Sequence, residues 1–351
     1  MTDPETTPIT LVTGGTGLLG SHLLFDLALK GEKVRAIRRA GSDTDLVRHV
    51  FGYYAGDADL LFSRIEWVEA DLMDFTAIAD ALTGVSTVYH AGAVVSFYPS
   101  DHRQMLKVNI EGTANLVNQS LAHGVRRLCY VSSVATLGRA ENQAVTTEET
   151  HWSPSAKNTV YAISKFGAER EVWRGMEEGL SALIVNPSVI LGPGFWQDNS
   201  GLFRLVHQGL KYYTPGVNGY VDVRDLCLAM TTLMENGLFG QRFICSAGNL
   251  SYQELFTLMA RYLDKPAPAV KVSPALSGLA WRIEAIRSRL TRSKPEITRE
   301  MAVTASQVYT YSSDKLCRAV NFRFRPLEET IRETCRYYLK DLEASRLDPA
   351  S

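Results

Sequence analysis

The stretch Thr13-Gly-Gly-Thr-Gly-Leu-Leu-Gly20 decides the fold of this chain. An apolar run, Ile9–Thr13, precedes it, and an apolar helical pattern from Leu18 to Lys30 follows it. Three glycines at this spacing suit a turn that holds a pyrophosphate, because the tight turn, the close approach of the backbone and the packing of helix on strand each exclude a Cβ. The start of the helix adds unpaired N–H groups. We therefore predict a dinucleotide-binding turn; the alternative is a glycine-rich turn without a ligand.

Short apolar runs alternate with helical patterns through the first half of the chain, which is typical of a parallel sheet covered on both faces. Long helical patterns lie at Met105–His123 and Tyr161–Glu178. The alternation predicts an α/β fold with a doubly wound parallel Rossmann sheet. The expected strands are Ile9–Thr13, Lys33–Ile37, Ile65–Glu69, Thr87–His90, Arg127–Val131, Ala182–Asn186 and, later in the chain, Arg242–Cys245.

The pattern becomes irregular after Asn186. A strand-to-helix pattern resumes at 220–234, and a capping box at Ser251–Glu254 opens a mainly helical remainder that ends at Leu327–Leu342. The expected domains are a dinucleotide-binding Rossmann domain over residues 1–187, to which 219–248 return, and a smaller, mostly helical C-terminal substrate-binding region over 188–218 and 249–345.

The composition excludes several classes of partner. The 351 residues carry 37 Lys and Arg against 38 Asp and Glu, so no global field favours nucleic acid. The five cysteines are scattered and form no Cys-x-x-Cys pair, which favours reduced thiols in a cytoplasmic protein. No metal-ligand cluster stands out among the seven histidines, and no apolar run approaches the roughly 20 residues that cross a bilayer.

The segment Trp281–Lys294 carries five cations against the single acid Glu284. A basic amphipathic helix of this kind can touch a membrane or an acidic partner. A solvated helix on a lid is the favoured alternative. The cations are Arg282, Arg287, Arg289, Arg292 and Lys294.

Tyr161 and Lys165 are spaced to share one face of a helix, one turn apart. In such a pair the lysine charge favours the phenolate and makes the tyrosine useful in proton transfer. Behind a dinucleotide-binding turn, the pair predicts redox chemistry. The alternative is that Tyr161 and Lys165 are only neighbours on a helix surface, as most Tyr and Lys residues with this spacing are.

The end of the second expected strand indicates which dinucleotide binds. An NAD site usually places an acid there, but this strand ends with Arg38 and Arg39, and the next acid is Asp43. An arginine suits a ribose phosphate through charge-assisted contacts. We therefore predict NADP, with NAD still possible; the alternative is that these arginines are solvated residues at the edge of a strand.

Several further motifs stand in one order along the chain, and together they resemble an extended short-chain dehydrogenase/reductase of the NAD-dependent epimerase/dehydratase superfamily. The similarity is greatest to the dihydroflavonol reductase and 3β-hydroxysteroid dehydrogenase-like branch, and it covers nearly the whole length. The motifs are 13–20, Asp71-Leu72, His90-Ala-Gly-Ala93, Asn109, Ser132-Ser133, Tyr161 with Lys165, 186–193 and Tyr220-Val-Asp-Val-Arg-Asp225.

The resemblance implies how the cofactor binds. Asp71 and Leu72 would cap the adenine, the backbone of 91–93 would pass beneath the cofactor, and Pro187 and its followers would pack beside the nicotinamide. The cofactor-binding residues expected on this basis are Gly14, Thr16, Gly17, Leu18, Leu19, Gly20, Arg38, Asp71, Leu72, Ala91, Gly92, Ala93, Lys165, Pro187 and Val189.

The resemblance also implies a catalytic set of Ser133, Tyr161 and Lys165. Ser133 would bond the substrate oxygen, Tyr161 would transfer the proton, and Lys165 would bind the nicotinamide ribose. Hydride transfer to a carbonyl leaves an alkoxide, and a hydroxyl donor and an acid suit it. The alternative for Ser132-Ser133 is bonding to the backbone at a strand end. Asn109 orders a water beside Lys165, caps a helix or is a buried structural amide; these alternatives stay open.

Departures from the family pattern narrow the reaction. Val134-Ala135 stands where dehydratases carry an Asp-Glu pair, so elimination is disfavoured, and Asn186-Pro187 is closer to the reductases. Aromatic residues in loops predict an apolar or ring-containing substrate, with core packing as their alternative. These aromatic residues are Phe97, Tyr98, Phe195, Trp196, Tyr212 and Tyr213.

We therefore expect an NADP(H)-dependent oxidoreductase that interconverts a ketone or aldehyde and an alcohol. One alternative is a nucleotide-sugar epimerase with tightly bound NAD, and another is a non-enzymatic dinucleotide-sensing regulator. The resemblance implies a homodimer formed by the two helices that carry Asn109 and Tyr161.

Overall fold

A computed structural model describes residues 8–138, 145–155, 158–196, 201–273, 281–282, 287 and 298–347. The basic segment predicted at Trp281–Lys294 lies mostly outside these residues. Within it, the Arg282 guanidinium lies over the Trp281 ring at 4.9 Å from the ring centroid.

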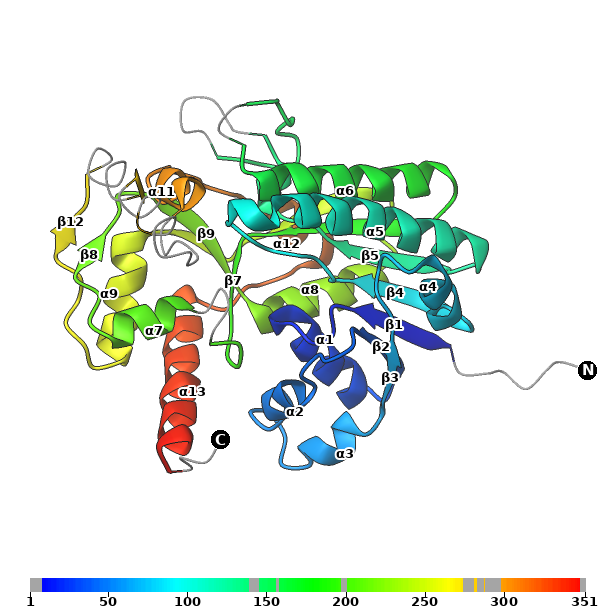
Figure 1. The fold of residues 1–351 in the computed structure, drawn as a ribbon, viewed down its shortest axis with the longest axis horizontal. Helices are drawn as coiled ribbons and strands as arrows, with labels where there is room; N and C mark the ends of the chain where they lie inside the picture. The colour runs from blue at the N-terminus through cyan, green and yellow to red at the C-terminus, as the bar shows by residue number, and fades with distance from the viewer. Residues whose placement is uncertain are drawn as a thin grey trace, which may run out of the picture.

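A seven-stranded sheet in the order β10-β6-β5-β4-β1-β2-β3 forms the centre of the molecule, and each neighbouring pair is parallel (Figure 1). The chain runs from β1 outward to β3 and then crosses back to β4. Ligands of such sheets bind at the carboxyl ends of the strands, where the order reverses. The strands are β1 Ile9–Thr13, β2 Lys33–Arg38, β3 Ile65–Glu69, β4 Val85–His90, β5 Arg127–Val131, β6 Ala182–Pro187 and β10 Gln241–Cys245.

Helices cover both faces of this sheet, which confirms the predicted doubly wound fold. Neighbouring residues of β1 point to opposite faces: Val12 packs in the core beneath α1 and α8, and Leu11 packs in the core beneath α4, α5 and α6. On the first face lie α1 Leu18–Leu29, α2 Asp45–Phe51, α3 Ala58–Phe62 and α8 Val223–Glu235. On the second lie α4 Phe75–Ala81, α5 His102–Ala122 and α6 Val160–Glu177.

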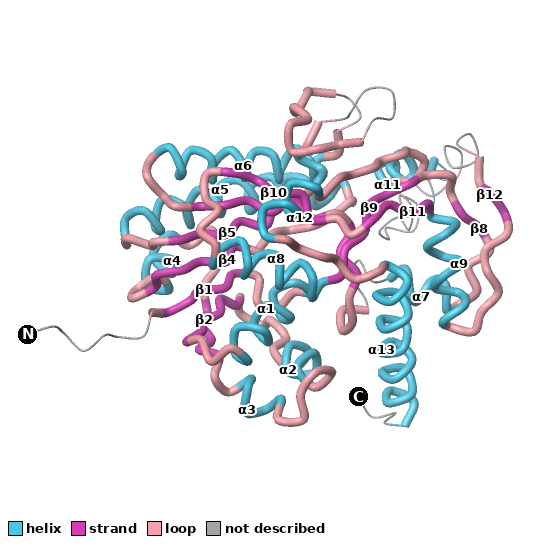
Figure 2. The backbone as a smooth tube through the Cα atoms, turned by 180° about the vertical axis from the view of Figure 1, so that it is seen from behind, coloured by secondary structure: helices cyan, strands magenta, loops and turns pink. Residues whose placement is uncertain are grey.

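A second, smaller layer follows β6 and packs beside the sheet (Figure 2). Its three-stranded sheet has the order β11-β9-β7, and α7, α9 and α13 share one apolar core with it. The elements are β7 Val189–Leu191, α7 Gly201–His207, β9 Val217–Asp222, β11 Gly248–Ser251, α9 Tyr252–Tyr262 and α13 Leu327–Leu347. The two-stranded sheet of β8 Tyr212–Tyr213 and β12 Val270–Lys271 and the short helix α11 Arg299–Thr304 complete it. Three further short elements lie beside the large sheet: α12 Asp314–Val320 next to β10, and the 3₁₀ turns η1 Pro99–Asp101 next to α5 and η2 Val134–Thr136 next to α6.

The predicted strands all form, and their ends differ from expectation by at most two residues. Helices α2 and α3 and strands β7 and β11 were not expected, because each is too short to show a period. The capping box forms as predicted, with both Ser251–Glu254 bonds present. The division into two domains stays a prediction; β9 lies in the small sheet, and Leu316 of α12 packs in the core beneath α1.

None of the helices in the described ranges is both long and apolar enough to cross a lipid bilayer. The cysteines are unpaired; Cys317 is half-buried and the others are buried.

The carboxylate of Asp222, at the start of α8, links the C-terminal helix α13 to the rest of the fold. Asp222 is 2% exposed and accepts bonds from the backbone N–H of Arg224 at 2.8 Å and from Thr330 Oγ1 at 2.9 Å. The Arg224 guanidinium bridges Asp222 at 2.6 Å and Glu333 of α13, also at 2.6 Å. The charged pair therefore links two distant parts of the chain.

Replacing Asp222 by alanine should lower the free energy of unfolding by about 3–5 kcal/mol, because Arg224 and Thr330 lose a buried partner. Chemical denaturation measures this. The matched control is Glu328→Gln, which breaks the exposed Arg261–Glu328 pair and should cost less than about 1 kcal/mol. Equal effects of the two substitutions would contradict the link.

Candidate active site

The glycine-rich turn lies against the end of β4, and this contact explains its glycines. Gly14 has φ +71°, and a Cβ added to it would lie 2.7 Å from the backbone nitrogen of Gly92. A Cβ added to Gly20 would lie 2.0 Å from the Gly14 carbonyl oxygen. Gly17 has more room, with its nearest atom at 3.5 Å. Gly14 and Gly20 therefore allow the close packing of the turn, and Gly17 leaves space beside it.

The start of α1 is a suitable place for a phosphate. Gly17 is its N-cap, so no side chain caps the helix, and no acidic residue stands in the first turn. The first N–H groups of such a helix are unsatisfied within the helix and favour an anion. Thr16 lies in this turn, and Leu18 and Leu19 reach the neighbouring cavity. The residues present therefore fit the pyrophosphate of a dinucleotide.

The arginines near the end of β2 differ in their surroundings. Arg35 donates to the carbonyls of Ala81 and Thr83 at 2.8 Å each and pairs with Glu66, so it is a structural residue. Arg38 is half-buried, and its Nε is buried without a hydrogen-bond partner among the described residues. The Nε of Arg35 also lacks a partner, but its guanidinium is held by these three contacts, whereas no hydrogen bond or ion pair to a described residue holds the guanidinium of Arg38.

At the proposed adenine end, Asp71 is exposed and its carboxylate accepts the N–H of Met73 at 2.8 Å. The carbonyl of Leu72 accepts a bond from Asn115 of α5 at 3.0 Å. The loop after β3 is thus held in place by its own turn and by α5.

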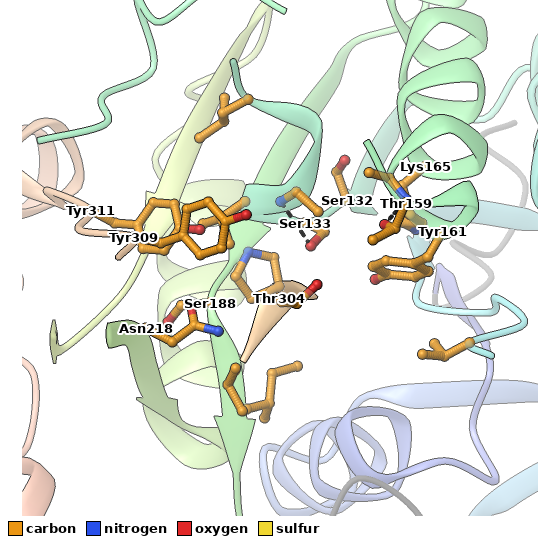
Figure 3. Close-up of a pocket in the computed structure, with 18 of the residues that line it drawn as sticks. Ser132, Ser133, Thr159, Tyr161, Lys165, Ser188, Asn218, Thr304, Tyr309 and Tyr311 are labelled. Carbon is orange, nitrogen blue, oxygen red and sulfur yellow. Dashed lines mark hydrogen bonds between the residues drawn. The ribbon is translucent and has the colours of Figure 1, made fainter. Parts of the chain in front are cut away.

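A cavity of about 480 Å³ lies between the carboxyl end of the sheet and the smaller layer (Figure 3). It brings together part of the predicted site from five separate segments. The predicted residues that line it are Leu18, Leu19, Ala91, Ala93, Ser133, Tyr161, Lys165, Pro187 and Val189. The predicted residues that do not line it belong to the turn, the adenine end and the backbone beneath; they are Gly14, Thr16, Gly17, Gly20, Arg38, Asp71, Leu72 and Gly92.

Ser133 and Tyr161 meet in this cavity. Ser133 starts the 3₁₀ turn after β5, where its Oγ accepts the N–H of Ala135 at 3.1 Å, and its hydroxyl also hydrogen-bonds Tyr161. Tyr161 stands in the first turn of α6, a helix capped by Thr159 Oγ1, which accepts the N–H of Ala162 at 3.1 Å. The local bonds of both segments therefore hold the two hydroxyls together.

Burial raises the pKa of Tyr161, and the hydrogen bond from Ser133 offsets this only in part. Lys165 is not among the groups that shift this pKa, and the expectation that Lys165 favours the phenolate stays a prediction. At neutral pH the phenol keeps its proton. Tyr161 is thus prepared to act as an acid.

Lys165 is 3% exposed and lies one helical turn beyond Tyr161. Its Nζ donates to the carbonyl of Val131 at 2.7 Å and lies 4.5 Å from the centroid of the Tyr130 ring. Burial lowers the pKa of Lys165 to about 7, and the carboxylate of Glu169 opposes this shift. Its charge is therefore sensitive to pH near neutrality.

Glu169 is the most connected residue that the sequence did not reveal. Its carboxylate is 2% exposed and accepts bonds from five side chains. The donors are Ser132 Oγ at 2.6 Å, Thr136 Oγ1 at 2.7 Å, Asn186 Nδ2 at 3.1 Å, Trp173 Nε1 at 3.3 Å and Arg242 Nη1 at 3.3 Å. The only signal in the sequence was its position four residues after Lys165, which places both on one face of α6.

This network separates the roles of the two serines. Both serines line the cavity, but the Ser132 hydroxyl is bound to Glu169, whereas the Ser133 hydroxyl bonds Tyr161. Asn109 lies in the middle of α5, so the helix-cap alternative is wrong. Its amide bonds the backbone of Val94 and the hydroxyl of Ser164, which favours a buried structural amide.

His90 is a second buried polar residue whose hydrogen bonds the sequence did not reveal. One ring nitrogen lies 2.7 Å from Thr13 Oγ1 and the other lies 3.0 Å from Thr113 Oγ1. Burial lowers the pKa of His90 to about 3, and the Lys165 charge adds to this, so the ring stays neutral. The contact ties the end of β1 to α5.

The aromatic residues expected at the pocket mouth are mostly elsewhere. Of that set, only Phe97 lines the cavity. Trp196 packs in the core of the smaller layer and donates to Asp341 at 2.7 Å, and Tyr212 is 56% exposed. Phe195 is buried, Tyr213 packs against the same core and Tyr98 precedes η1. Besides Phe97 and Tyr161, the aromatic residues that line the cavity are Tyr220, Tyr252, Tyr309 and Tyr311.

No group of His, Cys, Asp and Glu in the described part of the chain could hold a metal ion.

Comparisons with known proteins show what this chain is similar to. A model of the "NAD dependent epimerase/dehydratase family" matches residues 10–245, more than half of the chain. Sterol demethylase protein B of Methylococcus capsulatus is 31% identical over 274 residues, which are 76% of this chain and 78% of that protein. The bifunctional dihydroflavonol 4-reductase/flavanone 4-reductase of Pyrus communis is 26% identical and covers 91% of this chain and 93% of its own.

Among solved structures, a UDP-glucose 4-epimerase of Thermotoga maritima superposes with a TM-score of 0.74. It is 20% identical, and the match covers 95% of this chain and 99% of the epimerase. At this identity the similarity shows the fold alone.

Replacing Lys165 by methionine should change how stability depends on pH. The folded protein releases the Lys165 proton near pH 7, whereas the unfolded chain keeps it to the ordinary value of 10.5. The unfolded chain therefore binds more protons in this window, and the stability of the wild type should rise with pH relative to the variant. The difference should grow by on the order of 4 kcal/mol between about pH 7 and pH 10 in urea denaturation. Parallel curves would contradict a neutralised lysine.

Proposed function

We propose that this chain, which belongs to the NAD-dependent epimerase/dehydratase family, interconverts a ketone or aldehyde and an alcohol with NADP(H). Membership makes it an NAD(P)-dependent oxidoreductase of the short-chain dehydrogenase/reductase type. The relatives named for sterol and dihydroflavonol chemistry support a small, apolar or ring-containing substrate.

The observation that supports the proposal most strongly is that the lining of the cavity is almost entirely uncharged. Lys165 is the only charged side chain among the described residues that line it. A nucleotide sugar carries a diphosphate, which proteins usually bind with arginine, lysine or a helix start. The walls here are instead apolar, as Val95, Val134 and Leu202 show. This lining favours a neutral carbonyl substrate over a nucleotide sugar.

The catalytic hydroxyls suit carbonyl reduction. When bound, the reduced nicotinamide supplies the hydride. Negative charge then develops on the substrate oxygen, and preorganised donors stabilise it. Tyr161 holds a proton at neutral pH and transfers it to that oxygen, and Ser133 orients the same oxygen. Lys165, whose pKa is lowered to about 7, provides the donor for the nicotinamide ribose.

Two alternatives make different demands on these residues. A nucleotide-sugar epimerase would hold NAD tightly, would be purified with it and would act on a UDP-sugar. A regulatory dinucleotide sensor would need no catalytic hydroxyls, so the joined Ser133 and Tyr161 count against it.

The proposal includes a homodimer. Helices α5 and α6 lie side by side on the outer side of the sheet (Figure 1), and Ile163 of α6 is 44% exposed. Sedimentation velocity distinguishes the dimer from the monomer.

Replacing Arg38 by alanine should weaken NADPH binding by about tenfold to a hundredfold and leave NADH binding unchanged, because a charge-assisted contact to the ribose phosphate is lost. Titration of each cofactor by fluorescence measures this. Arg39→Ala, at an exposed neighbouring position, is the matched control and should bind NADPH as the wild type does. Tighter binding of NADH than NADPH by the wild type would reject the NADP assignment.

Replacing Tyr161 by phenylalanine should lower NADPH-dependent reduction by about a hundredfold or more, because the general acid is removed. The assay follows NADPH consumption with a panel of steroid, flavonoid and aliphatic ketones. NADPH affinity should not change. Tyr213→Phe, outside the cavity, is the control. Full turnover by the Tyr161 variant would show that another group donates the proton.

A further inference from the structure

Tyr220 presents a buried hydroxyl that lacks a partner. The residue lies on β9, is 0% exposed, and packs its ring with Leu191 and Phe203 in the core of the smaller layer. Its Oη makes no hydrogen bond to any described residue. Nevertheless, Tyr220 lines the cavity. Because buried polar groups are nearly always hydrogen-bonded in native proteins, an orphaned hydroxyl at a cavity wall indicates a bond that a ligand completes.

The surroundings of this hydroxyl are polar but uncharged. Tyr252, at the start of α9, shares a hydrogen bond with Asn218 of β9, and both line the cavity. Burial raises the pKa of Tyr220 and of Tyr252, so both phenols are neutral. The side-chain oxygen of Asn218 also accepts the N–H of Gly219 at 2.9 Å, which fixes the amide. These groups form a small set of neutral donors and acceptors.

Asn218, one member of this set, lies across the cavity from the catalytic residues. In Figure 3, Ser188 and Asn218 lie on one side and Tyr161 and Lys165 on the other, with Ser133 between them. The two walls come from different parts of the fold, because β5 and α6 carry the catalytic side chains and β9 and α9 carry Tyr220 and Tyr252. A ligand that touches both walls must span the cavity.

The lining of the cavity as a whole is mainly apolar. Its apolar side chains include Val95, Phe97, Val134, Leu137, Ile190 and Leu202. An apolar body therefore fits the middle of the cavity. An anionic group at the Tyr220 wall does not fit, because no described cation faces it and an unpaired buried anion is strongly disfavoured.

From these observations we infer that Tyr220, with Tyr252 and Asn218 beside it, forms a second polar subsite for a neutral oxygen at the far end of the substrate. The inference rests on the proposed function and deepens it. The substrate class is an uncharged, apolar, ring-containing compound with two oxygen functions at opposite ends. One is the carbonyl that Ser133 and Tyr161 address, and the other is a hydroxyl or carbonyl that Tyr220 bonds.

The test compares two steroid ketones that share one skeleton, androstanone with a single carbonyl and androstanedione with a second carbonyl at the opposite end. Their affinity for the protein saturated with oxidised NADP is measured by calorimetry, and their reduction by NADPH consumption. The wild type should bind the diketone about fivefold to tenfold more tightly than the monoketone, the strength of one neutral hydrogen bond.

In Tyr220→Phe this preference should disappear, and the affinity for the monoketone should change less than about twofold, because only a hydroxyl is removed. Tyr89→Phe, a buried tyrosine of β4 outside the cavity, is the control and should keep the preference. Should Tyr220→Phe fail to fold, Tyr252→Phe removes the adjacent hydroxyl and should reduce the preference.

The outcomes separate this inference from the proposed function. Binding with the diketone preference but without NADPH consumption would reject the reductase and keep the subsite. Turnover of both ketones with equal affinities, or a preference that persists in Tyr220→Phe, would overturn the subsite. Failure of both compounds to bind would overturn the substrate class and with it the inference.

Discussion

The buried carboxylate of Glu169 is the constraint on which the site depends. Burying a charge costs desolvation energy, which only its hydrogen-bond and ion-pair partners offset. Each lost partner therefore leaves part of a buried charge uncompensated. The partners of Glu169 come from the end of β5, the turn after it, β6 and β10. Since Glu169 itself lies on α6, this one group fixes the helix of Tyr161 against the strand end of Ser133.

The same arrangement keeps charge behind the cavity rather than in it. Arg242 neutralises Glu169 from β10, and its guanidinium is further held by the carbonyl of Glu148. Lys165 is left near the cavity with a pKa of about 7, and Tyr161 holds its proton. Tyr161 as a neutral acid, one helical turn from Lys165, which titrates near neutrality, suits the protonation of a carbonyl oxygen. The apolar walls exclude water from that step.

The sequence predicts those parts of the structure that depend on neighbours along the chain. The strands were visible because each is an apolar run, and the turn at Gly14–Gly20 because its spacing is local. The hydrogen bonds of Glu169 and His90 were not visible, since most of their partners lie far away in sequence and only the fold brings them close. The positions predicted for the aromatic residues in loops were mostly wrong for the same reason. Trp196, for example, packs against the core of the smaller layer and donates a hydrogen bond to Asp341 of α13. The pKa of Tyr161 depends on burial, which no spacing shows.

The chemistry and the choice of substrate are carried by separable parts of this molecule. The bonds that position Ser133, Tyr161 and Lys165 run through β5, β6, β10 and α6, and the described contacts of Glu169 include no residue of β9 or α9. The wall that carries Tyr220 belongs to the smaller layer, which has its own apolar core. Substitutions on β9 and α9 can therefore alter which compound fits while the proton-transfer geometry stays intact. In the proposed function, the Tyr161–Lys165 pair therefore belongs to the part of the fold that determines the reaction type, and the wall on β9 and α9 belongs to the part that selects the substrate.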